Sequence, residues 1–254
     1  YVVCPYEAYN GDEADVNVVA DVSEYIEELA RGIAERMTER GLKSGRILVY
    51  GSNTGSCFPA FGAAVKEYYP QFDTVSFNRT PGLGDVGAID ELSDYLLNNR
   101  DIKGLYACDE SSVPVAVKAR SKAIAAFKDI EAAEKASEKE TKKKEPESTP
   151  TPEPSAESAK PTPNPALLKQ ISITAFGCGL SDENLELFKD NDIYGLCIEP
   201  YYDAAATATM MLDRLMQGED TAKKVTVNRP IAYGDTIDKY KAIYNEVKEL
   251  FDVE

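Results

Sequence analysis

The sequence contains no histidine and no tryptophan among its 254 residues. Without histidine, the chain lacks the most frequent general base and the most frequent transition-metal ligand in proteins. No pattern elsewhere in the sequence indicates a nucleophile paired with a base. We therefore expect a protein that is not an enzyme and that carries no cofactor and no metal ion.

Long apolar runs and an excess of basic residues are also missing. No stretch of about 18 apolar residues occurs, so the sequence predicts no membrane-spanning helix. The 44 acidic residues outnumber the 28 basic residues, and the formal net charge is −16. Such a surface repels phosphate backbones and anionic lipids, which argues against a nucleic-acid partner. The chain starts at "YVVCPYE" without an initiating methionine or signal peptide, so we expect an upstream export signal to be missing.

Five cysteines are present, an odd number, so at least one cannot pair within the chain. None forms a C-x-x-C pair, and the spacing therefore does not indicate structural zinc. All five fall within or just after a predicted strand: Cys4, Cys57, Cys108, Cys178 and Cys197. A thiol cluster for a metal or a redox cofactor is one interpretation. We favour the other, in which these residues are small, nearly apolar side chains of the core.

Hydrophobic residues make up 43% of the chain, enough for a sizeable core. Apolar patterns predict strands at 1–6, 46–51, 72–78, 102–110, 170–179, 193–200 and 223–234. They predict helices at 21–40, 58–69, 86–99, 113–127, 182–191, 203–218 and 236–251. Regular alternation of nearly continuous apolar strands with helices is typical of an α/β protein, with a parallel sheet flanked by helices on both faces.

One segment departs from this alternation. Residues 131–165 contain no aromatic and no branched apolar residue and are rich in Glu, Lys, Pro, Ser and Thr. Such a composition cannot bury enough apolar surface to offset the entropy lost on ordering. We expect a disordered insertion there.

Polar and aromatic residues follow the predicted strands. In parallel α/β sheets, ligands bind beyond the carboxyl ends of the strands, so these positions are the candidate binding residues. They are Asn53, Cys57, Phe58, Asp109, Glu110, Glu199 and Tyr201. Carboxylates and amides accept hydrogen bonds from hydroxyl groups, and aromatic rings pack on the apolar face of a sugar, so the set suits a small polar molecule.

Structural roles remain open for several of these residues. Asp109 stands where it could cap the following helix, and Glu199 precedes a proline where capping is equally plausible. Tyr201 could be a packing residue. The loop "YGSNTGS" also resembles a flavodoxin phosphate loop, which leaves an FMN protein as an alternative.

The order of several motifs resembles the type I periplasmic sugar-binding proteins of ABC transporters and the effector domains of LacI-type regulators with the same fold. The motifs are "VVADVSEYIEELARGIAERM", "ILVYGSNTGSCFPAFGAAV", "IKGLYACDESSVPVAVKA", "ITAFGCG" and "LCIEPYYDAAATATMMLDRLMQGE". This family has two α/β lobes, joined by three crossover strands, that close over the ligand. The resemblance covers most of the chain outside 131–165.

The resemblance implies the following organisation. Residues 1–15 are a remnant of the first lobe with a crossover strand, and most of that lobe is absent. Residues 16–130 and 166–254 form the two parts of the second lobe, the latter with a crossover strand and the C-terminal helix, on either side of the insertion at 131–165.

The resemblance also implies a function: the solute-binding component of an ABC-type uptake system, which binds a sugar or related solute by hinge closure. Its partner would be the transporter permease, and its location would be the periplasm or the outer face of the cell membrane, attached as a lipoprotein through the missing N-terminus. A ligand-sensing regulatory module of the same fold is the alternative. The loop after the second strand lacks the arginine common in this family, and "AFGCG" lacks its aspartate, so an amino-bearing ligand or an atypical sugar also fits.

Overall fold

A computed structural model describes residues 2–6, 14–20, 22–142, 173–190, 192–234 and 236–251. Its larger sheet has six strands in the order β4-β3-β5-β6-β7-β9. All neighbours pair in parallel except β7 and β9. The bounds are β3 (Gly45–Gly51), β4 (Phe72–Asn78), β5 (Ile102–Ala107), β6 (Thr174–Cys178), β7 (Gly195–Cys197) and β9 (Ile231–Ala232).

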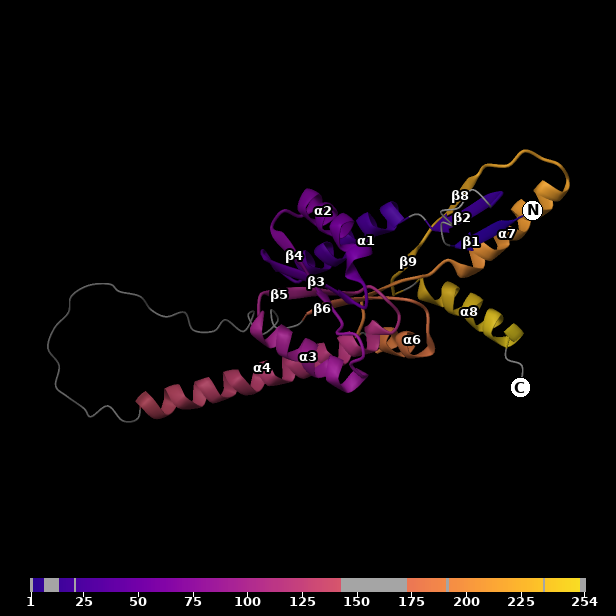
Figure 1. The fold of residues 1–254 in the computed structure, drawn as a ribbon. Helices are drawn as coiled ribbons and strands as arrows, with labels where there is room; N and C mark the ends of the chain where they lie inside the picture. The colour runs from indigo at the N-terminus through magenta and orange to yellow at the C-terminus, as the bar shows by residue number, and fades with distance from the viewer. Residues whose placement is uncertain are drawn as a thin grey trace, which may run out of the picture.

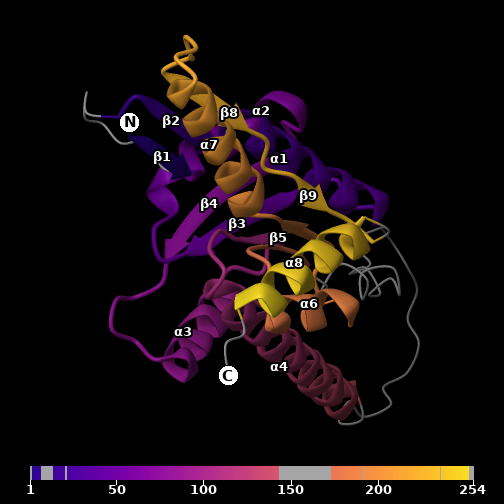
Figure 2. The same ribbon diagram turned by 90° about the vertical axis from the view of Figure 1, so that its right-hand side faces the viewer.

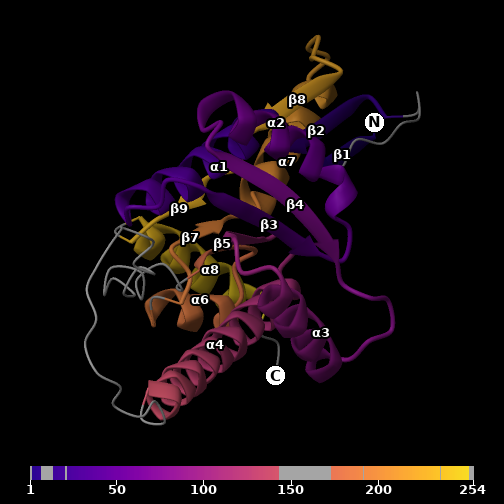
Figure 3. The same ribbon diagram turned by 90° about the vertical axis from the view of Figure 1, so that its left-hand side faces the viewer.

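Helices cover both faces of this sheet, as the sequence predicts. Figure 3 shows α1 (Val22–Glu39) and α2 (Phe58–Tyr68) on one side, and α3 (Asp85–Asn98) and α4 (Ser112–Lys142) on the other. Strand residues alternate between the two resulting cores: Ile47 and Val49 pack toward α1 and α2, and Leu48 packs toward α3 and α4. The α/β fold with a mostly parallel sheet is therefore confirmed.

A second, smaller sheet stands apart from the first (Figure 1). It consists of β1 (Val3–Tyr6), β2 (Val16–Ala20) and β8 (Lys224–Val227), all parallel, in the order β1-β2-β8. Helix α7 (Tyr201–Met216) packs on it through a small core that includes Val16, Val18 and Met211. Figure 2 shows α7 alongside these strands.

The sequence did not predict β2, and this strand changes the expected organisation. Val16 and Val18 are buried against α7, and their spacing of two is the signature of a strand. Because β2 pairs with β1, it belongs to the smaller sheet, whereas the expected boundary between residues 15 and 16 separates the two strands. The single strand predicted at 223–234 is in fact two strands, β8 and β9, in different sheets. Pro230 lies between them, and a proline interrupts strand pairing.

The expectation of disorder is wrong for the first part of the segment 131–165. Helix α4 continues to Lys142 and projects away from the body of the molecule (Figure 1). Residues 131–142 are mostly Ala, Glu and Lys, which have high helix propensity. Residues 143–165 lie outside the described residues.

The chain passes between the two sheets at three places, as in a two-lobed protein. The first passage leads from β2 to α1, the second is Ile198–Pro200 between β7 and α7, and the third is Asn228–Pro230 between β8 and β9. The Ile198 amide donates to the Pro230 carbonyl over 2.8 Å, which joins the second and third passages. We call these the crossover segments.

Two further helices flank the crossover segments. Helix α6 (Asp182–Lys189) follows β6, and α8 (Ile237–Phe251) follows β9. Leu185 and Phe188 of α6 form a core with Leu196 and with Ile237, the first residue of α8. Among the helices that the structure describes, none combines the length and apolarity needed to cross a bilayer.

Candidate functional site

The carboxyl edge of the larger sheet brings together the loops that follow β3, β5 and β6. Asp109, after β5, binds both neighbouring segments. Its Oδ2 accepts a hydrogen bond from the Ser52 amide over 2.7 Å, and its Oδ1 accepts bonds from the Ser111 hydroxyl and the Ser112 amide, each over 2.9 Å. Burial raises the pKa of this carboxyl group, but the bonds from Ser52 and Ser112 outweigh it, so the pKa lies below its ordinary value.

This arrangement agrees with the capping role left open for Asp109. Its carboxylate holds the first turn of α4 and at the same time fixes the loop after β3. It supports the site by positioning two loops, and it does not line the cavity described below.

The loop after β3 is unlike a phosphate loop, because protein acceptors already engage its donors. Asn78 Oδ1 accepts from the Thr54 amide over 3.0 Å and from the Thr54 hydroxyl over 2.8 Å. The Ser52 amide is bound to Asp109. Asn53 is exposed and precedes a short 3₁₀ turn, η1 (Thr54–Ser56), while Phe58 begins α2 and packs partly against the core. The geometry argues against the FMN alternative.

Four cysteines lie beneath this edge, and none of them is in a disulfide. Cys57, Cys178 and Cys197 are buried in the core below α1 and α2, and Cys108 packs against it. The Cys108 thiol contacts the Cys57 thiol, and this contact holds the pKa of Cys57 below its ordinary value. Within the described residues, no group of three or more His, Cys, Asp or Glu side chains is arranged to hold a metal ion. Cys57 and Cys197 are therefore surrounded by core side chains, whereas Cys178 also contacts charged groups.

Glu199 forms the centre of the crossover segments, where it pairs with Arg229. The carboxylate of Glu199 in the second segment and the guanidinium of Arg229 in the third form an ion pair, and both side chains are largely buried, 14% and 12% exposed. Cys178, at the end of β6, donates to Glu199 Oε1 over 3.1 Å and accepts from Arg229 over 3.0 Å. The Arg229 guanidinium also lies over the ring of Tyr25, 4.4 Å from its centre.

This network ties the two crossover segments to β6 and α1. It also leaves two buried polar atoms without a hydrogen-bond partner among the described residues, Glu199 Oε2 and Arg229 Nε. Buried polar atoms without partners are uncommon in native structures, and such atoms often face a missing water or ligand.

A cavity of about 690 Å³ opens beside this network, between the crossover segments, the start of α7 and the side of α8 that carries Tyr240 and Tyr244. Three carboxylates line it: Glu110, Glu199 and Asp203. Four aromatic rings line it as well: Tyr201, Tyr202, Tyr240 and Tyr244. Its volume and its mixture of apolar surface with a few polar groups are typical of sites for small molecules. Figure 2 shows α7 and α8 on the side of the molecule where it lies.

The cavity brings together three of the residues that the sequence singled out, Glu110, Glu199 and Tyr201. Asn53, Cys57, Phe58 and Asp109 follow strands at the same edge but do not line it. Sequence reasoning missed Arg229, and it missed the tyrosines of α8. Tyr240 and Tyr244 are four residues apart on a helix, a spacing that could have signalled a shared face. The lone Arg229 gave no such signal.

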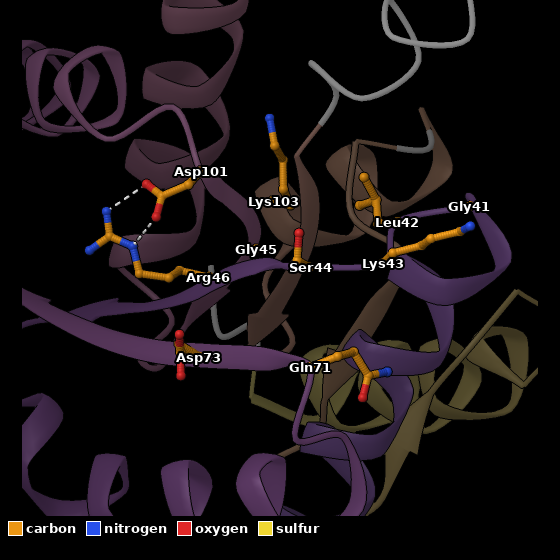
Figure 4. Close-up of a pocket in the computed structure, with 10 residues that line it drawn as sticks. All are labelled: Gly41, Leu42, Lys43, Ser44, Gly45, Arg46, Gln71, Asp73, Asp101 and Lys103. Carbon is orange, nitrogen blue, oxygen red and sulfur yellow. Dashed lines mark hydrogen bonds and ion pairs between the residues drawn. The ribbon is translucent and has the colours of Figure 1, made fainter.

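A second cavity, of about 490 Å³, lies at the opposite, amino edge of the larger sheet (Figure 4). There Arg46 is held by both carboxylate oxygens of Asp101, each over 2.6 Å. In the picture, Lys43 and Gln71 lie on the other side of the pocket from the Arg46–Asp101 pair. Because parallel α/β sheets bind ligands at the carboxyl edge, this depression is not the candidate site.

No protein-family model and no curated protein matches the sequence. Solved structures do match: the chain has the fold of the type I periplasmic sugar-binding proteins of ABC transporters. A carbohydrate-transporter solute-binding protein from Agrobacterium radiobacter, in complex with D-arabinose, has a TM-score of 0.63 and 15% identity, over 94% of this chain and 68% of its own. A periplasmic ribose ABC transporter protein from Conexibacter woesei has a TM-score of 0.60 and 15% identity, over 95% and 67%.

The fructose-binding periplasmic domain of a hybrid two-component system is also similar, with a TM-score of 0.62 and 14% identity, over 98% of this chain and 68% of that domain. Identities this low establish the fold alone. The chain accounts for about two thirds of each of these proteins, which agrees with the expectation that it represents part of a two-lobed protein. Two of these neighbours are described as binding proteins, and two are described as periplasmic.

Proposed function

We propose that the chain is the solute-binding component of an ABC-type uptake system and binds a sugar or a related small polar solute between its two sheets. The observation that carries this proposal is the cavity of about 690 Å³ beside the crossover segments, in a fold shared with sugar-binding proteins. It lies where a ligand can touch the larger sheet through Glu110, the crossover through Glu199, and the smaller sheet's helix through Tyr201.

The chemistry of the cavity suits such a ligand. Carboxylates accept hydrogen bonds from hydroxyl groups, and tyrosine rings offer flat apolar surface for a sugar face together with a polar hydroxyl. Glu199 Oε2 is buried without a hydrogen-bond partner in the described part of the chain, so a ligand hydroxyl would satisfy it. Asn53, Cys57, Phe58 and Asp109 contribute to the same edge, Asp109 by positioning its loops.

Hinge closure would be the mechanism. The crossover segments are the covalent connections between the sheets, and a ligand that contacts both sides stabilises the closed arrangement by its differential affinity for it. The Glu199–Arg229 ion pair joins two crossover segments. Its proposed role is to hold these two segments in a fixed position relative to each other while the hinge moves. The proposed partner is a transporter permease, and the proposed location is outside the cytoplasm, with attachment to the membrane surface through an N-terminal anchor.

Calorimetric titration of the natural full-length protein tests the proposal. The panel comprises neutral pentoses and hexoses, amino sugars and nucleosides, and the expected result is saturable heat with at least one neutral sugar. Glu199→Gln should weaken that binding, because it removes a charged acceptor, by about tenfold or more. The matched control is Glu219→Gln, an exposed carboxylate paired with Arg214 away from the cavity. Absence of heat with every compound would contradict the proposal.

A sensory module of the same fold is the second candidate. The observation in its favour is the similarity to the fructose-binding periplasmic domain of a hybrid two-component system. The alignment with that domain covers 98% of this chain. The ligand site would be the same, and the partner would be a signalling domain instead of a permease. Deletion of the encoding gene separates the two, because it abolishes sugar uptake in the first case and a transcriptional response in the second.

A further inference from the structure

The described residues include two pairs of cysteines whose thiols are in contact at the carboxyl edge of the larger sheet. Cys57 contacts Cys108, and Cys178 contacts Cys197. The two pairs differ in their access to solvent. Cys178 and Cys197 are 1% and 0% exposed, whereas Cys57 is 6% exposed and Cys108 is half-buried. A small reagent can therefore reach Cys57 and Cys108, which we call the outer thiol pair.

The two members of the outer thiol pair come from different segments, and the backbone fixes each of them. Cys108 directly follows β5, and its amide donates to the Tyr50 carbonyl over 2.8 Å. Its Sγ lies so close to Gly51 that a Cβ atom at that position would overlap it. Cys57 ends the turn η1, and its amide donates to the Thr54 carbonyl over 3.2 Å. The contact between the two thiols is therefore built into the fold.

Within the outer thiol pair, Cys57 is the more reactive thiol. It stands immediately before α2, and the positive end of a helix dipole favours a thiolate there. The contact between the two thiols lowers the pKa of Cys57 and raises the pKa of Cys108. The thiolate is the nucleophilic form of cysteine, and redox-sensitive cysteines often stand beside a second cysteine that resolves the oxidised form.

We propose that the outer thiol pair is a redox modification site, at which hydrogen peroxide converts Cys57 and Cys108 into a disulfide. The Cys57 thiolate attacks one peroxide oxygen, and the O–O bond breaks. The leaving hydroxide takes up the proton that the thiol released, which gives water and a sulfenic acid on Cys57.

The second step joins the two cysteines. The Cys108 sulfur attacks the Cys57 sulfur, the S–S bond forms and the S–O bond breaks, and the hydroxyl group leaves with the Cys108 proton as a second molecule of water. The two thiols together lose two electrons and two protons, and one peroxide is reduced to two molecules of water.

The disulfide would add a second connection between the loop after β3 and the segment after β5. The first connection is the hydrogen bond of 2.7 Å from the Ser52 amide to Asp109. The residue after Asp109 is Glu110, which lines the proposed sugar cavity. Because a cross-link between positions 57 and 108 restricts the unfolded chain, oxidation should stabilise this edge of the sheet. The site does not depend on which ligand the cavity binds.

The test is treatment of the reduced full chain with hydrogen peroxide, followed by alkylation of free thiols and by tryptic mapping without reduction. We expect one linked pair of peptides, residues 47–66 and 104–118, and a higher melting temperature. Dithiothreitol should reverse both changes. If no linked peptides formed, or if the linked peptides joined Cys178 to Cys197 and left residues 57 and 108 alkylated, the proposal would be overturned.

Substitutions test the order of the two steps. Cys108→Ser should leave Cys57 as a sulfenic acid that dimedone traps, whereas the parent protein should give little of this adduct because Cys108 resolves it. Cys57→Ser should give neither the adduct at position 57 nor the linked peptides.

Cys197→Ala is the matched control, because it removes a thiol of the other contacting pair. It should form the 57–108 linkage as the parent protein does. Melting curves of the reduced variants check that each one is folded, and Cys108→Ala replaces Cys108→Ser if the serine variant is not. Equal trapping of Cys57 by dimedone in the parent protein and in the Cys108 variant would overturn the proposal.

Discussion

The two sheets of this molecule differ in how completely they are covered. The larger sheet is buried between α1 and α2 on one face and α3 and α4 on the other, with Tyr50, Tyr106 and Phe176 almost fully inaccessible. The smaller sheet has three strands, and the helix that packs on it is α7, with Met210 and Met216 exposed on that helix. In the described part of the chain, one helix packs on these three strands and the shared core is small, so the stability of this sheet depends more on its neighbours.

The difference explains where the proposed binding site lies. The larger sheet supplies fixed loops, such as the segment that Asp109 holds, and the smaller sheet supplies α7 on the other side of the crossover. A rigid part and a part of lower intrinsic stability, joined by short segments, can change their relative position on binding. The Glu199–Arg229 pair lies at that junction.

The largest expected effect comes from the core of the larger sheet. Phe176 in β6 is 1% exposed and packs against the rings of Tyr194 and Tyr233. Phe176→Ala should lower the free energy of unfolding by about 3–5 kcal/mol, measured by urea denaturation, because it leaves a cavity. Val86→Ala, at a side chain 75% exposed on α3, is the control. A loss for Phe176→Ala as small as that of the control would contradict the account of the core.

A smaller effect is expected at the junction of the sheets. Arg229→Met should lower the free energy of unfolding by about 3 kcal/mol, since it leaves the largely buried Glu199 carboxylate unpaired. The double variant Arg229→Met/Glu199→Met should regain much of this loss, because both charges are then absent. Urea denaturation of the two variants provides the measurement. If the double variant were the less stable of the two, the pair would not be the source of the effect.

The smaller sheet should respond less to a comparable change. Val18 is buried against α7, and Val18→Ala removes about two methylene equivalents, which costs about 1–2 kcal/mol. Hydrogen exchange should show that amides of β1, β2 and β8 exchange faster than those of β3 and β5 in the parent protein, and faster still in the variant. If the amides of the two sheets exchanged at the same rate, the proposed difference in their stability would be contradicted.

The smallest effect is expected at Asp109. Asp109→Asn should cost about 1 kcal/mol at neutral pH, the usual cost of weakening a helix cap. The folded pKa lies below the unfolded value of about 3.9, so the charged group stabilises the fold above that value and loses this effect as the pH falls through the folded pKa. Urea denaturation at neutral pH and below pH 3.9 should therefore show the difference between parent and variant shrinking in acid. A constant difference would assign the loss to packing.

The sequence predicts the larger sheet well because its strands and helices carry clear local periodicity, as in Ile33 and Met37 of α1. It does not reveal β2, where five residues lie directly before a long helix, nor the division of 223–234 between two sheets, which depends on pairing with distant strands. Glu199 was found because it follows a strand. Arg229 was not, since its contact with Glu199 arises only when two crossover segments meet.

Hydrogen exchange of the full-length protein, with and without a saturating sugar from the calorimetric panel, tests the central claim most directly. We expect protection to increase at residues 198–202, at 109–111 and along the first half of α8, because these segments surround the cavity beside the crossover. Protection confined to residues 41–46 at the opposite edge (Figure 4), or no change at the crossover segments, would contradict the proposed site.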